Sequence, residues 1–569
     1  MDRQLGTRWK RLGGCRIARK NCRSSCRSGH GIVLMKTMFR RSVALGVSLF
    51  GVPLFGTSLF GMSMVGVMLL GMSLLGVTAG SVAAQDRPNA AQDRPGAAQE
   101  RPGAAEERPG AAEDRPGAAE ERPNAAQERP GAGASRAAQV GEARPAAADE
   151  RLLWPQFRGP RGDGHATASN LPERWNAFRN IAWQTPLPGS GWSSPIVVGD
   201  RIWVTAAQPK TLTAEEQAKR LAAFPAEQSE SLRAYGSVEL FALELAADTG
   251  RLLRRIELFT CDDPPIIHHV NSYASPTPAT DGEHLYCHFG AVGTVALDMR
   301  KGEVLWRRRF AVDEITGGGN SPVLVGERLI FSCDGTDAQF VVALNKATGE
   351  TLWKTNRPPI DATEPKYRRA FSSPLPIEVG GRALVVVPGA QWVVAYDPRD
   401  GREVWRVNYG DGHAIVPRPV FGNGMVYCCT GYPKPQLWAI RADGQGDITE
   451  SHVAWTCDRQ APEIASPILV GEELYMVSVI GVASCLDSRT GETRWQKRLG
   501  GNHAASPLYA DGKLYFASED GAVTVLKPGR EFTELARNQS TGIHMASPAA
   551  FGSSLLFRSS EALYCLREQ

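Results

Sequence analysis

The chain has 569 residues, of which 42% are hydrophobic, so it can bury a sizeable core and form more than one structural unit. Its formal charge of +4 is unevenly distributed, because positions 1–41 hold twelve basic residues and one acidic residue and leave the remainder at −7. This distribution argues against nucleic-acid binding. The eleven cysteines include no Cys-x-x-Cys-His sequence, which excludes covalent haem of that type, and their spacing is not that of a small disulfide-stapled fold.

The N-terminal 84 residues indicate export. Residues 1–34 resemble an over-extended start, with translation expected from Met35 or Met38, and the spacing of the cysteines in this extension fits no common zinc site. Residues 35–84 predict a signal peptide: basic residues precede a long uncharged stretch, and Val82-Ala83-Ala84 forms a small-residue cleavage site. The alternative is an uncleaved membrane anchor, since the apolar stretch exceeds the roughly 20 residues that span a bilayer. We therefore expect a periplasmic, cell-surface or extracellular protein that contacts the membrane only if this segment is retained.

Residues 85–150 predict a disordered linker. Up to position 133 they repeat a seven-residue unit of the form Gln-Asp-Arg-Pro-Gly-Ala-Ala. A coiled coil is excluded, because each unit carries a proline and there is no apolar seam. Low hydrophobicity and balanced charge instead favour a solvated tether.

From Trp192 onward the chain repeats itself eight times at intervals of roughly 40 to 50 residues, which indicates an array of similar units. Seven copies contain a Ser-Pro pair, and the other reads Arg418-Pro419. The serines of these pairs are Ser194, Ser275, Ser321, Ser373, Ser466, Ser506 and Ser547.

A second motif ends most copies. Asp or Asn starts a turn, Gly follows, and Trp comes four residues after that Gly, as in the segments ending at Trp306, Trp353, Trp405 and Trp495. Asp and Asn bond the backbone of such turns, and Gly supplies the positive φ. We expect these four tryptophans to be largely buried between neighbouring units.

Each copy contains about four short runs of β-branched, aromatic and apolar residues, which predicts a four-stranded unit. Units of this period form the blades of an all-β, eight-bladed β-propeller covering residues 151–569. The last copy stops at Leu566 without its Trp strand, and a matching segment, Asn180 to Gln184, precedes the first copy. We therefore expect the N-terminal strand to complete the last blade and close the ring.

The repeated turn, together with the lead-in Trp154-Pro155-Gln156-Phe157-Arg158-Gly159-Pro160, resembles the PQQ-like (pyrroloquinoline quinone) propeller repeat family, especially secreted members from planctomycete-type bacteria. The family includes quinoprotein dehydrogenases and the outer-membrane assembly propeller. The resemblance thus implies either pyrroloquinoline quinone with calcium or a cofactor-free scaffold. No segment matches the family's calcium ligands or catalytic aspartate. The sequence favours a monomeric, non-catalytic scaffold for a protein or cell-envelope polysaccharide; the alternatives are a quinoprotein oxidoreductase and a sugar-active enzyme at the channel mouth.

Polar and aromatic residues recur just before the Ser-Pro pairs, where equivalent loops of a propeller approach the central channel. We expect them to converge on one ligand site at the channel mouth, for a metal, a sugar or a carboxylate. The alternative is a solvated rim without a ligand. The residues are Trp192, Asn271, Asn320, Arg369, His413, Glu463, His503 and His544.

Three further features have local interpretations. Adjacent Cys428 and Cys429 resemble the vicinal disulfide of quinoproteins, but in a strand their side chains face opposite sides and need no bond. His268 and His269 are adjacent and chelate poorly without a third ligand. Residues 211–235 form an insertion, predicted to be either a lid or a surface decoration.

Overall fold

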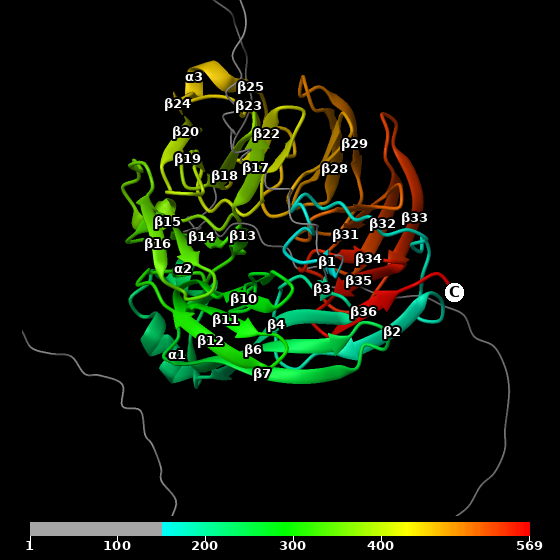
Figure 1. Cartoon of the computed structure of the whole chain (residues 1–569), viewed down its shortest axis with the longest axis horizontal. Helices are drawn as coiled ribbons and strands as arrows, with labels where there is room; N and C mark the ends of the chain where they lie inside the picture. Colours follow the sequence, from blue (N-terminus) through cyan, green and yellow to red (C-terminus); the bar gives the residue numbers. More distant parts are fainter. Residues whose placement is uncertain (1–150) are drawn as a thin grey trace, which may run out of the picture. The chain divides into compact units, whose positions relative to one another are not determined.

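The computed structural model describes residues 151–569, and the predicted extension, signal segment and linker lie outside this range. Strands from eight successive segments form eight sheets arranged in a ring, as the repeat predicts (Figure 1). The second and third strands of a sheet, such as β27 (Glu473–Val477) and β28 (Val482–Asp487), are almost wholly buried because neighbouring sheets cover both faces. Outer strands such as β29 (Thr493–Arg498) are mainly exposed.

The first four blades, from inner to outer strand, have the following bounds. Blade 1 contains β3 (Ile196–Val198), β4 (Arg201–Thr211), β6 (Tyr235–Ala246) and β7 (Leu252–Asp262). Blade 2 contains β9 (Ala279–Thr280), β10 (His284–His288), β11 (Thr294–Asp298) and β12 (Glu303–Arg308). Blade 3 contains β13 (Val323–Val325), β14 (Arg328–Asp334), β15 (Gln339–Asn345) and β16 (Thr351–Asn356). Blade 4 contains β17 (Leu375–Val379), β18 (Arg382–Pro388), β19 (Trp392–Tyr396) and β20 (Glu403–Asn408).

The remaining blades follow in the same order. Blade 5 contains β21 (Val420–Gly422), β22 (Met425–Cys429), β23 (Leu437–Arg441) and β25 (Val453–Cys457). Blade 6 contains β26 (Ile468–Val470), β27, β28 and β29. Blade 7 contains β30 (Leu508–Ala510), β31 (Lys513–Ala517), β32 (Ala522–Lys527) and β33 (Thr533–Gln539). Blade 8 contains β34 (Ala549–Phe551), β35 (Ser554–Arg558), β36 (Ala562–Leu566) and, from the other end of the chain, β2 (Ile181–Pro186).

Short elements decorate the ring. β1 (Leu152–Trp154) pairs with the inner strand β3, and β24 (Gly446–Asp447) pairs with the outer strand β20. The other elements are α1 (Ala214–Leu221), α2 (Ala226–Ser229), α3 (Thr449–His452), β5 (Leu232–Arg233), β8 (Ile267–His268), η1 (Gly290–Val292) and η2 (Pro365–Arg368). None of the helices in residues 151–569 has both the length and the apolar character needed to cross a bilayer.

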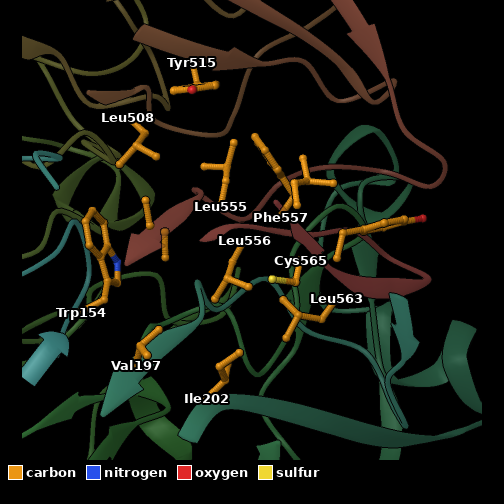
Figure 2. Packing of buried hydrophobic residues seen from close by; sticks show 14 of the residues in the cluster. Trp154, Val197, Ile202, Leu508, Tyr515, Leu555, Leu556, Phe557, Leu563 and Cys565 are labelled. Atoms are coloured by element: carbon orange, nitrogen blue, oxygen red, sulfur yellow. The ribbon is translucent and has the colours of Figure 1, made fainter. Parts of the chain in front are cut away.

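The N-terminal strand closes the ring, which confirms the prediction from the incomplete last copy. β2 pairs antiparallel with β36, from Ile181 opposite Leu566 to Pro186 opposite Ala562, so the two ends of the ring lie side by side (Figure 1). Blades 7, 8 and 1 and the lead-in strand β1 share one core, in which Trp154 packs near Val197 and Leu556 (Figure 2). The closure therefore rests on backbone pairing and on a continuous apolar core.

The repeated tryptophan docks each blade onto the next one. The indole nitrogen of Trp353 donates to Pro398 O at 3.0 Å, and that of Trp405 donates to Ala442 O at 3.1 Å. Equivalent bonds start from Trp183, Trp306, Trp455 and Trp495. Trp353, Trp405 and Trp495 are buried as predicted, whereas Trp306 is only partly buried.

The turn glycine has a second role that its positive φ alone does not reveal. A Cβ added at Gly401 would lie 2.4 Å from the Trp353 ring, and one at Gly349 would lie 2.6 Å from the Trp306 ring. The tryptophan of one blade thus lies against the bare turn of the next. The sequence motif did not identify Trp455, because an insertion that contains β24 and α3 separates this residue from the turn of its own blade.

Two Gly→Ala changes should separate these roles. Gly326 and Gly401 both have positive φ, at 57° and 73°, but no atom lies within 4 Å of a Cβ added at Gly326. Gly326→Ala should therefore cost only the left-handed strain of about 1–2 kcal/mol. Gly401→Ala should cost about 1–3 kcal/mol more, because it also displaces Trp353. Denaturant unfolding of both variants measures the difference, and equal losses would contradict the docking role.

Trp405→Ala provides an independent check on the packing. Trp405 is fully buried between blades, so its removal should cost about 3–5 kcal/mol of unfolding free energy. The same change at the partly buried Trp306 should cost less. Equal losses of unfolding free energy in the two variants would contradict the difference in burial.

Candidate functional site

A chamber of about 350 Å³ lies at the centre of the ring. Its lining includes the residues of the repeated Ser-Pro positions: Ser194, Thr277, Ser321, Ser373, Ser466, Ser506 and Ser547. Blade 2 contributes both Ser275 and Thr277 to the lining, but the Thr277 hydroxyl accepts the bond from the preceding blade, whereas that of Ser275 donates to Asn271 Oδ1. Reading Ser275 as the equivalent residue was wrong by two positions, because Ser275-Pro276 is followed at once by Thr277-Pro278.

The hydroxyls at these positions connect the inner strands. Ser321 N donates to Ser373 Oγ at 2.8 Å, and Ser466 N donates to Ser506 Oγ at 2.9 Å. The same bond occurs at four further places round the ring, between 2.9 and 3.0 Å. Six of the seven hydroxyls thus satisfy a buried N–H of the preceding blade, which explains the Ser or Thr at these positions.

The lead-in segment closes the chamber at one end. β1 runs along the inner strand of blade 1 and ends at Trp154, and Phe157 lines the chamber. The chain then turns back beside blade 7, where Tyr509 N donates to Gly164 O and Ala166 N donates to Tyr509 O. It leaves where Ser169 N donates to Gly552 O, in the hairpin between β34 and β35. The segment therefore enters and leaves at the same end of the ring.

The opposite end, where the chamber opens, is here named the chamber face. It carries the loops that precede each inner strand and the hairpins between second and third strands, because successive antiparallel strands reverse direction. Four exposed apolar side chains lie in these loops, and we name them the apolar rim: Val270, Tyr432, Ile480 and Ile543.

Two arginines fasten the lead-in segment. Arg418 Nη1 donates to Phe157 O at 2.7 Å, and Arg158 Nη2 donates to Pro467 O at 2.8 Å. Glycines make room for both groups, since a Cβ at Gly162 or at Gly164 would strike a guanidinium. Burial lowers the pKa of Arg158 to about 10 and that of Arg418 to about 9, so both remain cationic at neutral pH.

Three of the eight predicted site residues line the chamber: Trp192, Asn271 and Arg369. The Trp192 indole donates to Val270 O at 3.0 Å, and Asn271 Nδ2 donates to Thr316 O at 2.8 Å. His268, which the sequence singled out only as half of a histidine pair, also lines this side. Burial, and then the nearby positive charges of His269 and Arg369, lower the pKa of His268 and favour its neutral form.

The other five predicted residues do not line the chamber. Asn320 is buried, and Glu463 is half-buried in the loop before β26. The His413 ring lies between those of Tyr367, which is tilted at a centroid distance of 4.7 Å, and Tyr432, which is edge-on at 5.5 Å. The expectation that all eight gather round one ligand is thus not met by this geometry.

The two remaining histidines support their loops. His503 Nε2 bonds Gly500 O at 3.1 Å, and His544 Nε2 bonds Thr541 O at 3.2 Å. Burial lowers the pKa of both. The residues that follow them, Ala504 and Met545, line the chamber in their place. The direction of the local backbone decides this, because adjacent side chains of an extended segment point to opposite sides.

The metal and disulfide hypotheses find no matching arrangement. Within residues 151–569, no group of three His, Cys, Asp or Glu side chains is placed to hold a metal ion. Cys428 and Cys429 are free thiols in β22, and Cys428 packs in the core with blade 4 while Cys429 packs in the core with blade 6. Burial raises the pKa of Cys428 to about 12.

The insertion of residues 211–235 supports one wall of the chamber. β5 pairs with β8, which carries His268, and Leu221, Leu232 and Ala234 form a small core of their own. None of the residues 211–235 lines the chamber. The geometry therefore fits a buttress better than either the predicted lid or a passive decoration.

A second cleft of about 400 Å³ lies between this insertion and the loop Arg309–Glu314. The Glu314 carboxylate accepts a hydrogen bond from Ala291 N at 2.8 Å. Burial, and then the charges of Asp334 and Asp313, raise the pKa of Glu314 to about 7. This carboxyl group is therefore a buried proton-binding group outside the chamber.

Comparison with known proteins agrees with the repeat. A family model described as outer membrane protein assembly factor BamB matches residues 337–478 and 453–531. The curated BamB of Alteromonas naphthalenivorans is 28% identical over 255 residues, which cover 41% of this chain and 57% of that protein. The chain thus spans less than two thirds of this relative's length.

Two solved structures share the fold. The europium-containing methanol dehydrogenase has a TM-score of 0.50 at 11% identity and covers 73% of this chain and 91% of its own. The quinohemoprotein alcohol dehydrogenase ADHIIG from Pseudomonas putida HK5 has the same score and identity, with 74% and 80% covered. The protein is an eight-bladed β-propeller. The match to the BamB family model supports PQQ-like repeats in its blades, and the two dehydrogenases share the propeller fold.

The chamber residues do not fit the calcium and quinone pair that some members of this fold imply. Calcium prefers carboxylate and carbonyl oxygens, and no Asp or Glu is among the residues that line the chamber. The charged side chain there is Arg369, which would repel a cation. No catalytic step through the quinone is therefore derived for this chain.

The raised pKa of Glu314 predicts a pH-dependent change in stability. Below the unfolded-state value of 4.5 the carboxyl group is protonated in both states; above it, only the unfolded chain loses the proton until the pH passes about 7. Native Glu314 therefore lowers stability progressively from pH 4.5 to 7, by up to about 3 kcal/mol. Glu314→Gln should raise stability at pH 8 and leave it unchanged at pH 4.

Urea unfolding at both pH values measures this effect. Glu531→Gln, the same change at an exposed carboxylate, serves as the control and should show no such difference. An identical pH dependence for the Glu314 variant and the parent protein would contradict the assignment.

Proposed function

We propose that this protein is an exported, non-catalytic scaffold that binds a protein partner on its chamber face. The observation that carries the proposal is the apolar rim around a chamber that is closed at its base. Four of the eight large apolar side chains that are exposed within residues 151–569 lie on this face, which favours a protein partner there. Similarity to an outer membrane protein assembly factor supports a role in binding protein rather than polysaccharide.

The path of the lead-in segment also supports a partner on the chamber face. Residue 151 enters the ring at the end opposite the chamber face, where Arg151 O accepts a bond from Gly199 N in the hairpin between β3 and β4. Chain entry on the side away from the chamber face supports this face as the one presented to a partner, and the predicted linker would act as a spacer.

Site-specific photo-crosslinking in the native host tests the proposal. A benzophenone amino acid at Ile480, in the apolar rim, should form an adduct with one discrete protein. The same probe at Leu305, on the outer strand of blade 2, provides a matched control, since the exposed fractions of the two side chains are 47% and 45%. Equal labelling at both positions, or no protein adduct at Ile480, would refute a partner on this face.

A further inference from the structure

Arg369 contributes a positive charge to the chamber wall; the charge of Asp313 acts on it from a distance, without a direct ion pair. Its Nη1 donates to Thr316 Oγ1 at 2.7 Å and its Nε donates to Lys366 O at 2.9 Å. No carboxylate within residues 151–569 forms a salt bridge with it, and its Nη2 makes no hydrogen bond to the described chain. Arg369 is partly buried, and its unpaired Nη2 is a ready donor for an anionic group from outside.

Two more guanidinium groups lie beside the base of the chamber. Arg418 and Arg158 make their hydrogen bonds to backbone carbonyl oxygens, and neither forms a salt bridge within the described part of the chain. Nε of both groups and Nη2 of Arg418 are buried without a hydrogen-bond partner. The carboxylate of Asp163 acts on both groups but does not line the chamber, so two guanidinium groups against one carboxylate leave the base next to Phe157 electropositive.

The opposite wall is apolar. Val416, Ile464 and Met545 line the chamber across from the side that holds Trp192, His268 and Asn271. A ligand that fits both walls combines one anionic group with an apolar body. The volume of about 350 Å³ is at the lower end of the range for small-molecule sites, so the occupant is short.

We propose that the chamber captures the C-terminal end of a partner polypeptide, with its carboxylate on Arg369 and its last apolar side chains against Val416, Ile464 and Met545. This inference rests on the proposed function and specifies how the partner is held. A chain end suits the site because the lead-in segment closes the base, so a polypeptide that enters cannot pass through. The apolar rim then contacts the residues that precede the end.

Fluorescence anisotropy with the full-length protein tests the assignment. The probes are labelled octapeptides, Gly-Ser-Gly-Ser-Gly followed by three residues drawn from Leu, Ile, Val, Met and Phe, each made as the free acid and as the C-terminal amide. The best free acids should bind at least ten-fold more tightly than their amides. Arg369→Gln should remove this difference by weakening the free acids alone, and Arg369→Lys should restore part of it.

Arg368→Gln is the matched control. Arg368 precedes Arg369 in the same loop, but it donates to Ala362 O and does not line the chamber, so its loss should leave both probe sets unchanged. Equal binding of acids and amides, or an unchanged preference in Arg369→Gln, would overturn the proposal. Tighter binding of 4-phenylbutyrate than of every peptide would also overturn it, by identifying a small carboxylic acid as the ligand.

The two proposals can fail separately. If the Ile480 adduct persists in an Arg369→Gln background while acids and amides bind alike, a partner binds the chamber face without inserting its chain end. If the free acids bind selectively and Ile480 forms no adduct, the chamber binds carboxylates but the protein scaffold role is wrong.

Discussion

The stacking of a tryptophan on the bare turn of the next blade is the contact on which the ring depends. A single four-stranded sheet leaves both faces of its middle strands apolar, and only neighbouring blades cover them. Trp353 against Gly401 sets the spacing near the outside of the ring, and Ser373 against the Ser321 amide sets it near the axis. Because neighbouring blades are in contact both near the axis and near the outside, the angle between them is fixed, and eight blades complete the ring.

Closure also determines how the site is built. Because β2 completes blade 8, the residues before it must reach the outside of the ring from the interior. The chain from Trp154 to Trp175 makes that path through the channel and across blades 7 and 8, and so blocks one end. β2 removes the free edge of blade 8, and the segment that leads to β2 closes one end of the central channel and so forms the chamber. It also separates the point of chain entry from the chamber mouth.

The chamber is asymmetric although the blades are repeats. One side holds Trp192, Asn271 and Arg369, and the other holds Val416, Ile464 and Met545. The loops before the inner strands cause this difference, since they lie outside the regular strands and vary in length and direction. In this propeller the inter-blade contacts recur from blade to blade, whereas the loops supply different side chains to the chamber.

The eight-bladed ring and its closure could be predicted from the sequence, because they depend on a repeated pattern of strand, turn and tryptophan. The packing of Cys428 and Cys429 on opposite faces of β22 followed from strand alternation in the same way. The site could be predicted only in part. Adjacent residues of a loop point to opposite sides, so Ala504 faces the chamber and His503 faces away from it, and no periodic pattern indicates which. Phe157 blocks the channel, and Arg418 lies beside it and donates a hydrogen bond to its carbonyl oxygen. These two residues are about 260 positions apart, so only the folded ring brings them together.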